Sequence, residues 1–185
     1  GSKTCGGTSI ISEHTHKLFP NFWEELKWER VVNTQAYWWL TEDSLLSVEY
    51  KSLRLLSAPY NRFTVKRSNL YQWLSEKAVS VGTTLLLEHT VTKVLFNNQY
   101  ACGIHVASPV KTFLSDLVIL ADGTNSLLAE KEGLINTLSA KNLSLYVKET
   151  IALPASVIEE RFGLSDTQGA IIGLIGYPTA GFNGT

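Results

Sequence analysis

An aspartate and a glycine near the middle of the chain have the types and spacing that could hold a nucleotide. Asp122 and Gly123 follow the apolar run 118–120 and precede a helical pattern at 127–132, which predicts a buried strand that turns into a helix. A carboxylate at a strand end accepts hydrogen bonds from sugar hydroxyls, while the glycine and the helix N-terminus favour close approach of a phosphate. A plain corner, in which Asp122 only caps the turn, explains the same residues equally well.

No further arrangement of side chains indicates a catalytic group. The sequence contains no Gly-x-Ser-x-Gly, no His-Glu-x-x-His and no lysine-containing phosphate loop. Cys5 and Cys102 are far apart and form no Cys-x-x-Cys, so we predict no zinc or iron–sulfur site. The catalytic residues therefore stay unknown at this stage.

Composition excludes some classes of partner. A net charge of −1 over 185 residues, without a basic stripe, argues against nucleic acid. No run of about 18 apolar residues predicts a membrane span, and the use of two cysteines suits a reducing cytoplasm. The count of methionines is 0 and no Gly-x-Gly-x-x-Gly follows a strand, so we expect a segment of a longer protein.

The predicted elements alternate between two kinds of layer. Residues 31–40 and 45–50 flank a polar turn, which predicts a β-hairpin. Its Trp38 and Trp39 could line an apolar cavity or a partner surface, although packing into the sheet core is the more usual role of such residues. Residues 169–176 predict a glycine-spaced strand of the same layer.

The other layer consists of strands that lead into helices. The patterns predict strands at 60–66, 83–88, 90–96 and 101–106, with helices after Thr8 or Ser9, over 21–29 and from Ser68 to Gly82. The strand predicted at 143–149 and the helix predicted after Pro154 belong to the antiparallel layer. Alternating strands and helices of this kind indicate an α/β (α+β) chain.

Two sets of residues carry a resemblance to known families. Residues 120–126, Leu-Ala-Asp-Gly-Thr-Asn-Ser, resemble the second flavin fingerprint of the FAD enzymes that include aromatic hydroxylases and geranylgeranyl reductases. Residues 125–131, 147–149 and 153–162 resemble the FixC family, which is related to electron transfer flavoprotein-quinone oxidoreductases. The resemblance extends from Thr4 to the end of the chain.

The resemblance implies a fold and an activity. It implies a partial FAD-binding Rossmann-type domain, residues 1–29 and 60–141, interleaved with an antiparallel-sheet substrate domain, residues 30–59 and 142–185. The first βαβ unit would lie upstream of Gly1, so this segment alone would hold an incomplete FAD site and be inactive. The whole protein would be an FAD-dependent oxidoreductase that passes electrons between an electron transfer flavoprotein and a quinone, or that acts on another apolar substrate.

The resemblance also assigns roles to individual residues and a location. Asp122 would bind ribityl or ribose hydroxyls, with Gly123 and Ser126 beside the phosphates. The remaining cofactor-binding positions are the ring neighbours Gly6 and Gly7, the pyrophosphate-binding Arg67, and Val91 near the adenine. A turn at Gly6 and a surface salt bridge at Arg67 are the alternatives. A flavin enzyme needs few catalytic side chains.

The location would be cytoplasmic, with a peripheral position at the inner membrane face as an option. A non-enzymatic binding module with an aromatic-lined apolar site is the competing hypothesis.

Overall fold

The chain folds into an α+β arrangement of two compact units. The computed structural model describes residues 6–123, 125–136, 139–143, 147–177, 180 and 183–184. Unit 1 consists of Gly1–Val81 and Lys148–Thr185, and unit 2 consists of Gly82–Val147. Unit 2 is thus inserted, in sequence, between the two parts of unit 1.

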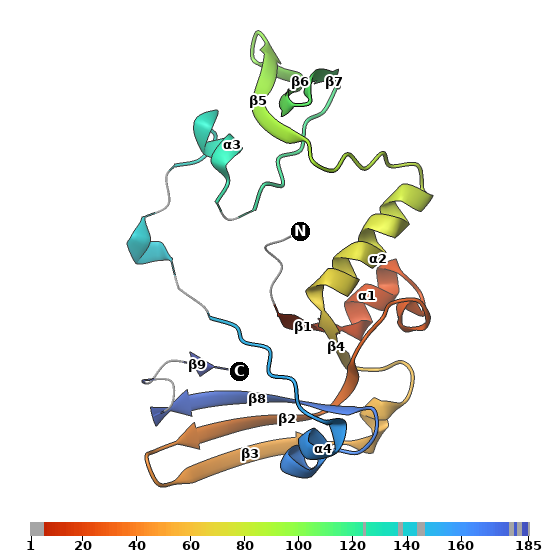
Figure 1. Ribbon diagram of the computed structural model, residues 1–185, viewed down its shortest axis with the longest axis vertical. Helices are drawn as coiled ribbons and strands as arrows, with labels where there is room; N and C mark the ends of the chain where they lie inside the picture. The colour runs from red at the N-terminus through yellow and green to blue at the C-terminus, as the bar shows by residue number, and fades with distance from the viewer. Residues whose placement is uncertain are drawn as a thin grey trace. The chain divides into compact units, whose positions relative to one another are not determined.

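Unit 1 is built on a mixed sheet with strands from both ends of the chain (Figure 1). The order is β1-β4-β2-β8-β9. Strand β3 pairs with residues 34–40 of β2, and β4 pairs with residues 30–31 of β2. The strands are β1 (Gly7–Ile11), β2 (Arg30–Leu40), β3 (Leu45–Lys51), β4 (Arg62–Lys66), β8 (Gln168–Gly176) and β9 (Asn183–Gly184).

The predicted hairpin and the predicted glycine-spaced strand are confirmed, but one direction is wrong. β2 and β3 are antiparallel, whereas β2 and β8 run parallel from Val31 beside Gln168 to Leu40 beside Gly176. The alternation of apolar and polar residues sets which face of a strand is buried and carries no information on strand direction. The antiparallel prediction for these two segments is therefore corrected.

The N-terminal helix begins later than predicted. Residues 7–11 form β1, which is antiparallel to β4, and the helix α1 (Ser12–Leu18) follows with Ile11 as its N-cap. Ile10 is buried beside Phe63, so sheet pairing outweighs the capping signal of Thr8 and Ser9. The helix predicted over 21–29 is reduced to the single 3₁₀ turn η1 (Phe22–Glu24).

Aromatic side chains dominate the core of unit 1. Phe63 is fully buried, and its ring lies 5.0 Å from that of Tyr60, 5.1 Å from Trp28 and 5.7 Å from Phe22. Trp73 adds the buried face of helix α2 (Arg67–Ser80) to this cluster. The helix predicted after β4 is confirmed, although Lys66 and not Ser68 is the N-cap.

Two further helical segments belong to unit 1. Helix α4 (Ala155–Phe162) begins directly after Pro154, as predicted, and ends at Gly163 with φ +60°. The 3₁₀ turn η2 (Leu53–Leu56) links β3 to β4. A glycine in β8 makes room for an aromatic ring: a Cβ atom added to Gly173 would lie 2.8 Å from Tyr37 Cδ1.

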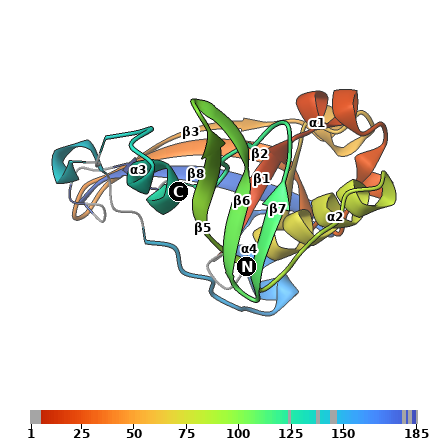
Figure 2. The ribbon, with the colours of Figure 1, turned by 90° about the horizontal axis from the view of Figure 1, so that it is seen from above.

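Unit 2 is a three-stranded antiparallel meander with one short helix (Figure 2). Its strands are β5 (Thr90–Asn97), β6 (Tyr100–Ser108) and β7 (Val110–Leu114). Helix α3 (Leu127–Lys131) is tied to β5, because the Val94 amide donates to Glu132 Oε1 at 3.0 Å and Lys131 Nζ donates to Thr92 O at 2.7 Å. The 3₁₀ turn η3 (Ala140–Asn142) follows.

Two predicted strands of unit 2 are wrong. Residues 83–88 and 118–120 form no strand, and Leu87 and Ile119 are 70% and 78% exposed. A strand persists only when a neighbouring strand satisfies its backbone groups, and no described strand pairs with either segment. Of the strand predicted at 143–149, residues 144–146 lie outside the described residues, and 147–149 are not in a strand.

The compact units divide the chain at other places than the predicted functional domains. β4 and α2, assigned from the sequence to the FAD-binding domain, share the sheet and core of unit 1 with β2. The division into an FAD-binding and a substrate domain is a functional assignment, and it stays a prediction.

Candidate functional site

Asp122 lies five residues before the start of helix α3 (Leu127–Lys131), and its side chain caps two amides of that helix. The amides of Leu128 and Ala129 donate to Asp122 Oδ2 at 3.1 and 3.4 Å. Accordingly, two of the helix amides that were expected to face a phosphate are occupied by the chain's own carboxylate. Of the two roles that the sequence left open for Asp122, the structure therefore shows the capping role.

The turn between Asp122 and α3 leaves a glycine backbone open. Gly123 has φ +79°, a conformation that favours glycine, and a Cβ atom placed on it would meet nothing within 4 Å. Ser126 closes the turn, since its amide donates to Gly123 O at 3.1 Å and its hydroxyl donates to the same oxygen.

The residues of this turn meet part of what a nucleotide cofactor requires. A carboxylate has two oxygens, and among the described residues only Oδ2 of Asp122 accepts a hydrogen bond. The free Oδ1 atom, on an exposed side chain next to the open Gly123, fits the hydroxyls of a sugar. The N-terminus of α3, which has five residues, does not fit a phosphate, because Asp122 already uses its amides.

Three of the predicted cofactor-binding residues come together at the edge of unit 1. Gly6 has φ +75°, and its carbonyl accepts the amide of Arg67 at 3.4 Å. Gly7 pairs with Lys66 in the sheet, so the pair of glycines forms a strand start and not a helix-entry turn. Lys148 lies over both, with Nζ 3.3 Å from Gly7 O. Within the described part of the chain, the side chain of Arg67 forms no salt bridge.

The predicted positions therefore fall into two sets. Gly6, Gly7 and Arg67 belong to unit 1. The unit 2 set is Val91, Asp122, Gly123 and Ser126. Val91 is a half-buried residue of β5 that pairs with Val106.

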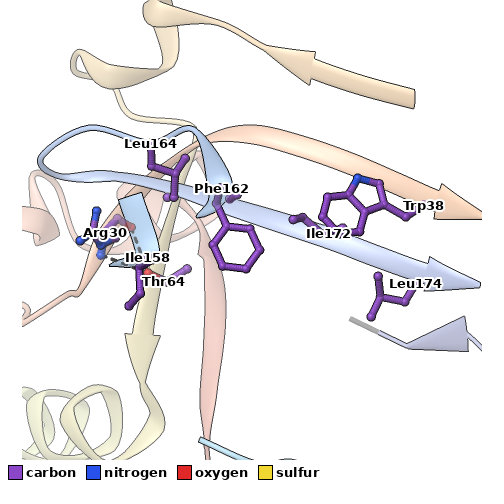
Figure 3. A pocket seen from close by; sticks show the side chains of 10 residues that line it. Arg30, Trp38, Thr64, Ile158, Phe162, Leu164, Ile172 and Leu174 are labelled. Carbon is purple, nitrogen blue, oxygen red and sulfur yellow. Dashed lines mark hydrogen bonds between the residues drawn. The ribbon is translucent and has the colours of Figure 1, made fainter. Parts of the chain in front are cut away.

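An apolar cavity of about 460 Å³ lies in unit 1 between helix α4 and the β2–β8 face (Figure 3). Its lining is aromatic and aliphatic apart from two polar residues at one end. The lining side chains are those of Arg30, Trp38, Thr64, Ile158, Phe162, Leu164, Ala170, Ile172 and Leu174. The sequence suggested that Trp38 could line a cavity. The sequence pattern did not indicate that helix α4 would form the other wall of that cavity.

Arg30 anchors the polar end of this cavity. Its Nη1 atom donates to the carbonyls of Asp166 and Gln168 at 2.6 and 3.0 Å, and its Nη2 atom donates to Glu159 Oε1 at 3.0 Å. Thr64 is also satisfied, because its hydroxyl accepts the Arg30 amide at 3.0 Å and donates to the Arg30 carbonyl at 3.2 Å.

The face of the hairpin β2–β3 that points away from the cavity is apolar and exposed. Tyr37 and Trp39 are 57% and 39% exposed, and the facing residues of β3, Leu46 and Val48, are exposed as well. The expectation that the hairpin tryptophans pack into the sheet core is therefore wrong for Trp39, because α4 covers the other face of the sheet.

In the described part of unit 1, three carboxylates have lowered pKa values, those of Glu13, Glu25 and Asp43, and none belongs to the predicted site. The pKa of Glu13 is lowered by its hydrogen bond from Lys17 on the exposed face of α1. The pKa of Glu25 is lowered by hydrogen bonds from Lys77 and then Trp73. The pKa of Asp43 is lowered by hydrogen bonds from Ser44 and Thr41 in the hairpin turn. All three carboxylates therefore stabilise local structure in their charged form.

Comparison with known proteins shows similarity to FixC proteins. No family model matches it. It is 33% identical over 173 residues to Protein FixC of Rhizobium meliloti (strain 1021), which covers 93% of this chain and 40% of that relative. It is 32% identical over 184 residues to Protein FixC of Escherichia coli (strain K12), covering 100% of this chain and 42% of the relative.

One observation on the helices and one further relative complete the description. In the described part of the chain, no helix has the length and apolar character needed to cross a bilayer. Protein FixC of Bradyrhizobium diazoefficiens is 31% identical over 185 residues, again across 100% of this chain and 42% of the relative. The chain is thus FixC-like along its whole length, and it spans about two fifths of the FixC proteins that it matches.

Proposed function

We propose that this chain is part of an FAD-dependent oxidoreductase. The observation that carries the proposal is the turn at 122–126. Its sequence resembles a flavin fingerprint, and its geometry presents one carboxylate oxygen of Asp122 beside the open backbone of Gly123. The similarity to FixC proteins along the whole chain supports the same assignment.

The chain's own residues would hold the cofactor in the following way. Asp122 Oδ1 would accept a sugar hydroxyl while Oδ2 keeps the carboxylate oriented through the α3 amides. Gly123 would let the backbone approach, and Ser126 would fix the turn. The amides of Leu128 and Ala129 have no role in phosphate binding in this proposal.

For unit 1, considered by itself, we propose three cofactor-binding residues, Gly6, Gly7 and Arg67. The Arg67 guanidinium has paired donors that suit a pyrophosphate, and the backbones of Gly6 and Gly7 offer close approach to a ring. Val91 of unit 2 would contribute backbone contacts to the adenine. When bound, the isoalloxazine supplies the electron or hydride chemistry, so the chain's task is positioning and exclusion of water.

We propose an electron transfer flavoprotein and a quinone as the partners, and a cytoplasmic location that includes the membrane surface.

The flavin content of the purified full-length protein tests this proposal. We expect a stoichiometric amount of FAD, measured by flavin absorbance and by chromatography of the cofactor released on denaturation. Protein that is folded but contains no flavin, and takes none up from added FAD, contradicts the proposal. That result would favour the non-enzymatic binding module.

A further inference from the structure

We propose that the ammonium group of Lys148 raises the reduction potential of the bound flavin. This inference rests on the proposed function and deepens it, because it adds a residue and an electrostatic role that the flavin proposal does not contain. Two observations in unit 1 support it. They are the contact of Lys148 with the glycine pair Gly6–Gly7 and the balance of charge around that contact.

Lys148 lies against the backbone of both glycines. Its Nζ atom donates to Gly7 O at 3.3 Å. A Cβ atom added to Gly6 would lie 3.3 Å from Lys148 Cδ, so a larger residue there would push the lysine stem aside. Gly6 also has φ +75°, a conformation that favours glycine. The stem of Lys148 therefore covers Gly6, and its charged end reaches the carbonyl of Gly7.

The neighbouring glycine keeps space for a ring. Among the described residues, a Cβ atom added to Gly7 would meet only the backbone oxygen of Val65, at 3.5 Å. That distance is an ordinary van der Waals contact, and no side chain fills the position. The backbone of Gly7 thus fits the close approach of a flat ring that the proposed function requires of it, with the ammonium of Lys148 beside it.

The charge of Lys148 is available to a ligand. An ammonium has three donors, and within the described part of the chain Lys148 uses one, on Gly7 O. Neither Lys148 nor Arg67 forms a salt bridge with a described residue. Lys66, the sheet partner of Gly7, is paired with Glu29 at 3.6 Å. Two positive charges without an acidic partner therefore remain at this edge of the sheet.

A positive charge beside a flavin favours its reduced form. In the proposed function the ring accepts two electrons from the electron transfer flavoprotein. Taken up with one proton, the two electrons leave the reduced ring with one negative charge, whereas uptake of two protons leaves it neutral. The ammonium of Lys148 attracts the negative charge, most strongly where the protein excludes water. It therefore makes reduction easier and opposes uptake of the second proton.

Matched substitutions in the flavin-loaded full-length protein test this role. Lys148→Met keeps an apolar stem over Gly6 and removes the charge, and Lys148→Arg keeps the charge. Lys17→Met is the control, because it removes a cation that Glu13 already pairs at 3.1 Å on α1. The measurement is the two-electron midpoint potential, obtained by equilibration with a redox dye.

The potential should fall only in the variant that lacks the charge. We expect Lys148→Met to disfavour reduction at least tenfold, a fall of about 30 mV for a two-electron couple. Lys148→Arg and Lys17→Met should change the equilibrium less than threefold. An unchanged potential in Lys148→Met, or an equal fall in Lys17→Met, would overturn the proposal.

Proton uptake separates an effect of charge from an effect of packing. Near pH 6 we expect the unmodified protein to take up about one proton per two electrons, a tenfold change in the reduction equilibrium per pH unit, or about 30 mV. Lys148→Met should approach two protons, a hundredfold change per pH unit, or about 60 mV. Altered packing alone would change flavin content without changing this slope. The same slope in both proteins would contradict the role of the charge.

Flavin content separates failure of this inference from failure of the proposed function. Unmodified protein that is folded and takes up no flavin rejects both. Stoichiometric flavin with an equal potential in Lys148→Met rejects the role of Lys148 and leaves the proposed function standing. If Lys148→Met fails to fold in urea unfolding or loses its flavin, the slope of the unmodified protein near pH 6 decides. Uptake of two protons per two electrons there would overturn the inference.

Discussion

Asp122 Oδ2 lies 3.1 Å from the amide nitrogen of Leu128, so the residue proposed to hold a cofactor also caps helix α3. The two roles use different oxygens of the same carboxylate. Any experiment on Asp122 must therefore separate loss of the cap from loss of the ligand contact.

Substitutions of Asp122 achieve this separation. Asp122→Ala removes the cap and should cost about 0.5–2 kcal/mol of unfolding free energy. Asp122→Asn keeps an oxygen for the cap but replaces the second oxygen by a donor, so it should retain stability and still lower flavin content. Urea unfolding and flavin per chain are the two measurements. Asp116→Asn, at an exposed aspartate nearby in the sequence, is the control and should change neither. Full flavin content in Asp122→Asn would remove Asp122 from the cofactor site.

The Arg30–Glu159 pair should stabilise α4 against the sheet. The two side chains are 21% and 28% exposed, which places the pair between surface and buried salt bridges. We expect Glu159→Gln to lower the unfolding free energy by about 1 kcal/mol, with a smaller difference at high salt. Glu160→Gln, at the exposed neighbouring position, should have no measurable effect. Equal effects of the two substitutions in urea unfolding would contradict this role of Arg30.

Glu25 should make stability depend on pH. Its pKa in the folded chain is below the ordinary value of 4.5, because Lys77 and then Trp73 donate to the carboxylate. The unfolded chain therefore binds more protons in this range. The stabilisation is present above about pH 4.5 and is lost as the pH falls through the folded pKa.

The measurement is the urea midpoint of Glu25→Gln against the unmodified protein between pH 3 and 7. We expect the difference to be largest at neutral pH and to shrink below the ordinary pKa of 4.5. Glu24→Gln, at the last residue of η1 and next to Glu25 in the sequence, is the control, because no salt bridge involves Glu24 among the described residues. A difference that does not vary with pH would exclude a contribution from the Glu25 charge.

Phe63 should be the most costly position of the aromatic core. It is fully buried, with three aromatic rings within 5.7 Å of its own. We expect Phe63→Ala to lower the unfolding free energy by about 3–5 kcal/mol. Phe96→Ala, at a side chain that is 46% exposed, should cost far less, and calorimetry or urea unfolding compares the two. A similar loss at both positions would show that burial in unit 1 is not what stabilises the fold.

The sequence predicted most elements whose signals are local. The hairpin β2–β3, the helix after β4 and the helix after Pro154 follow from alternation, helical spacing and the proline, all of which act within one segment. The start of α1 was missed because Ile10 and Ile11 fit a helix as well as a strand, and only the pairing with β4 decides between them. The parallel direction of β8 was missed for a similar reason, since its partner is remote in sequence.

The candidate site was predicted in part. The turn at Gly123 and the helix after it follow from the sequence, and Asp122 was expected either to cap or to bind. The strand predicted before it depends on a neighbouring strand, and none pairs with it among the described residues. The cavity under α4 could not be predicted, because Trp38 and Phe162 come together only through the parallel pairing and the Arg30–Glu159 contact.

The insertion of unit 2 between β2 and β8 has a consequence for biosynthesis. The central strand β2 leaves the ribosome well before its parallel neighbour β8, which begins only at Gln168, after the whole of Gly82–Val147. At roughly 5–20 residues per second, translation of the intervening stretch takes on the order of ten seconds. During that interval the edge of β2 that later pairs with β8 has no partner strand, and it is open to pairing with other chains. Chaperone capture of the nascent chain should therefore peak before β8 emerges.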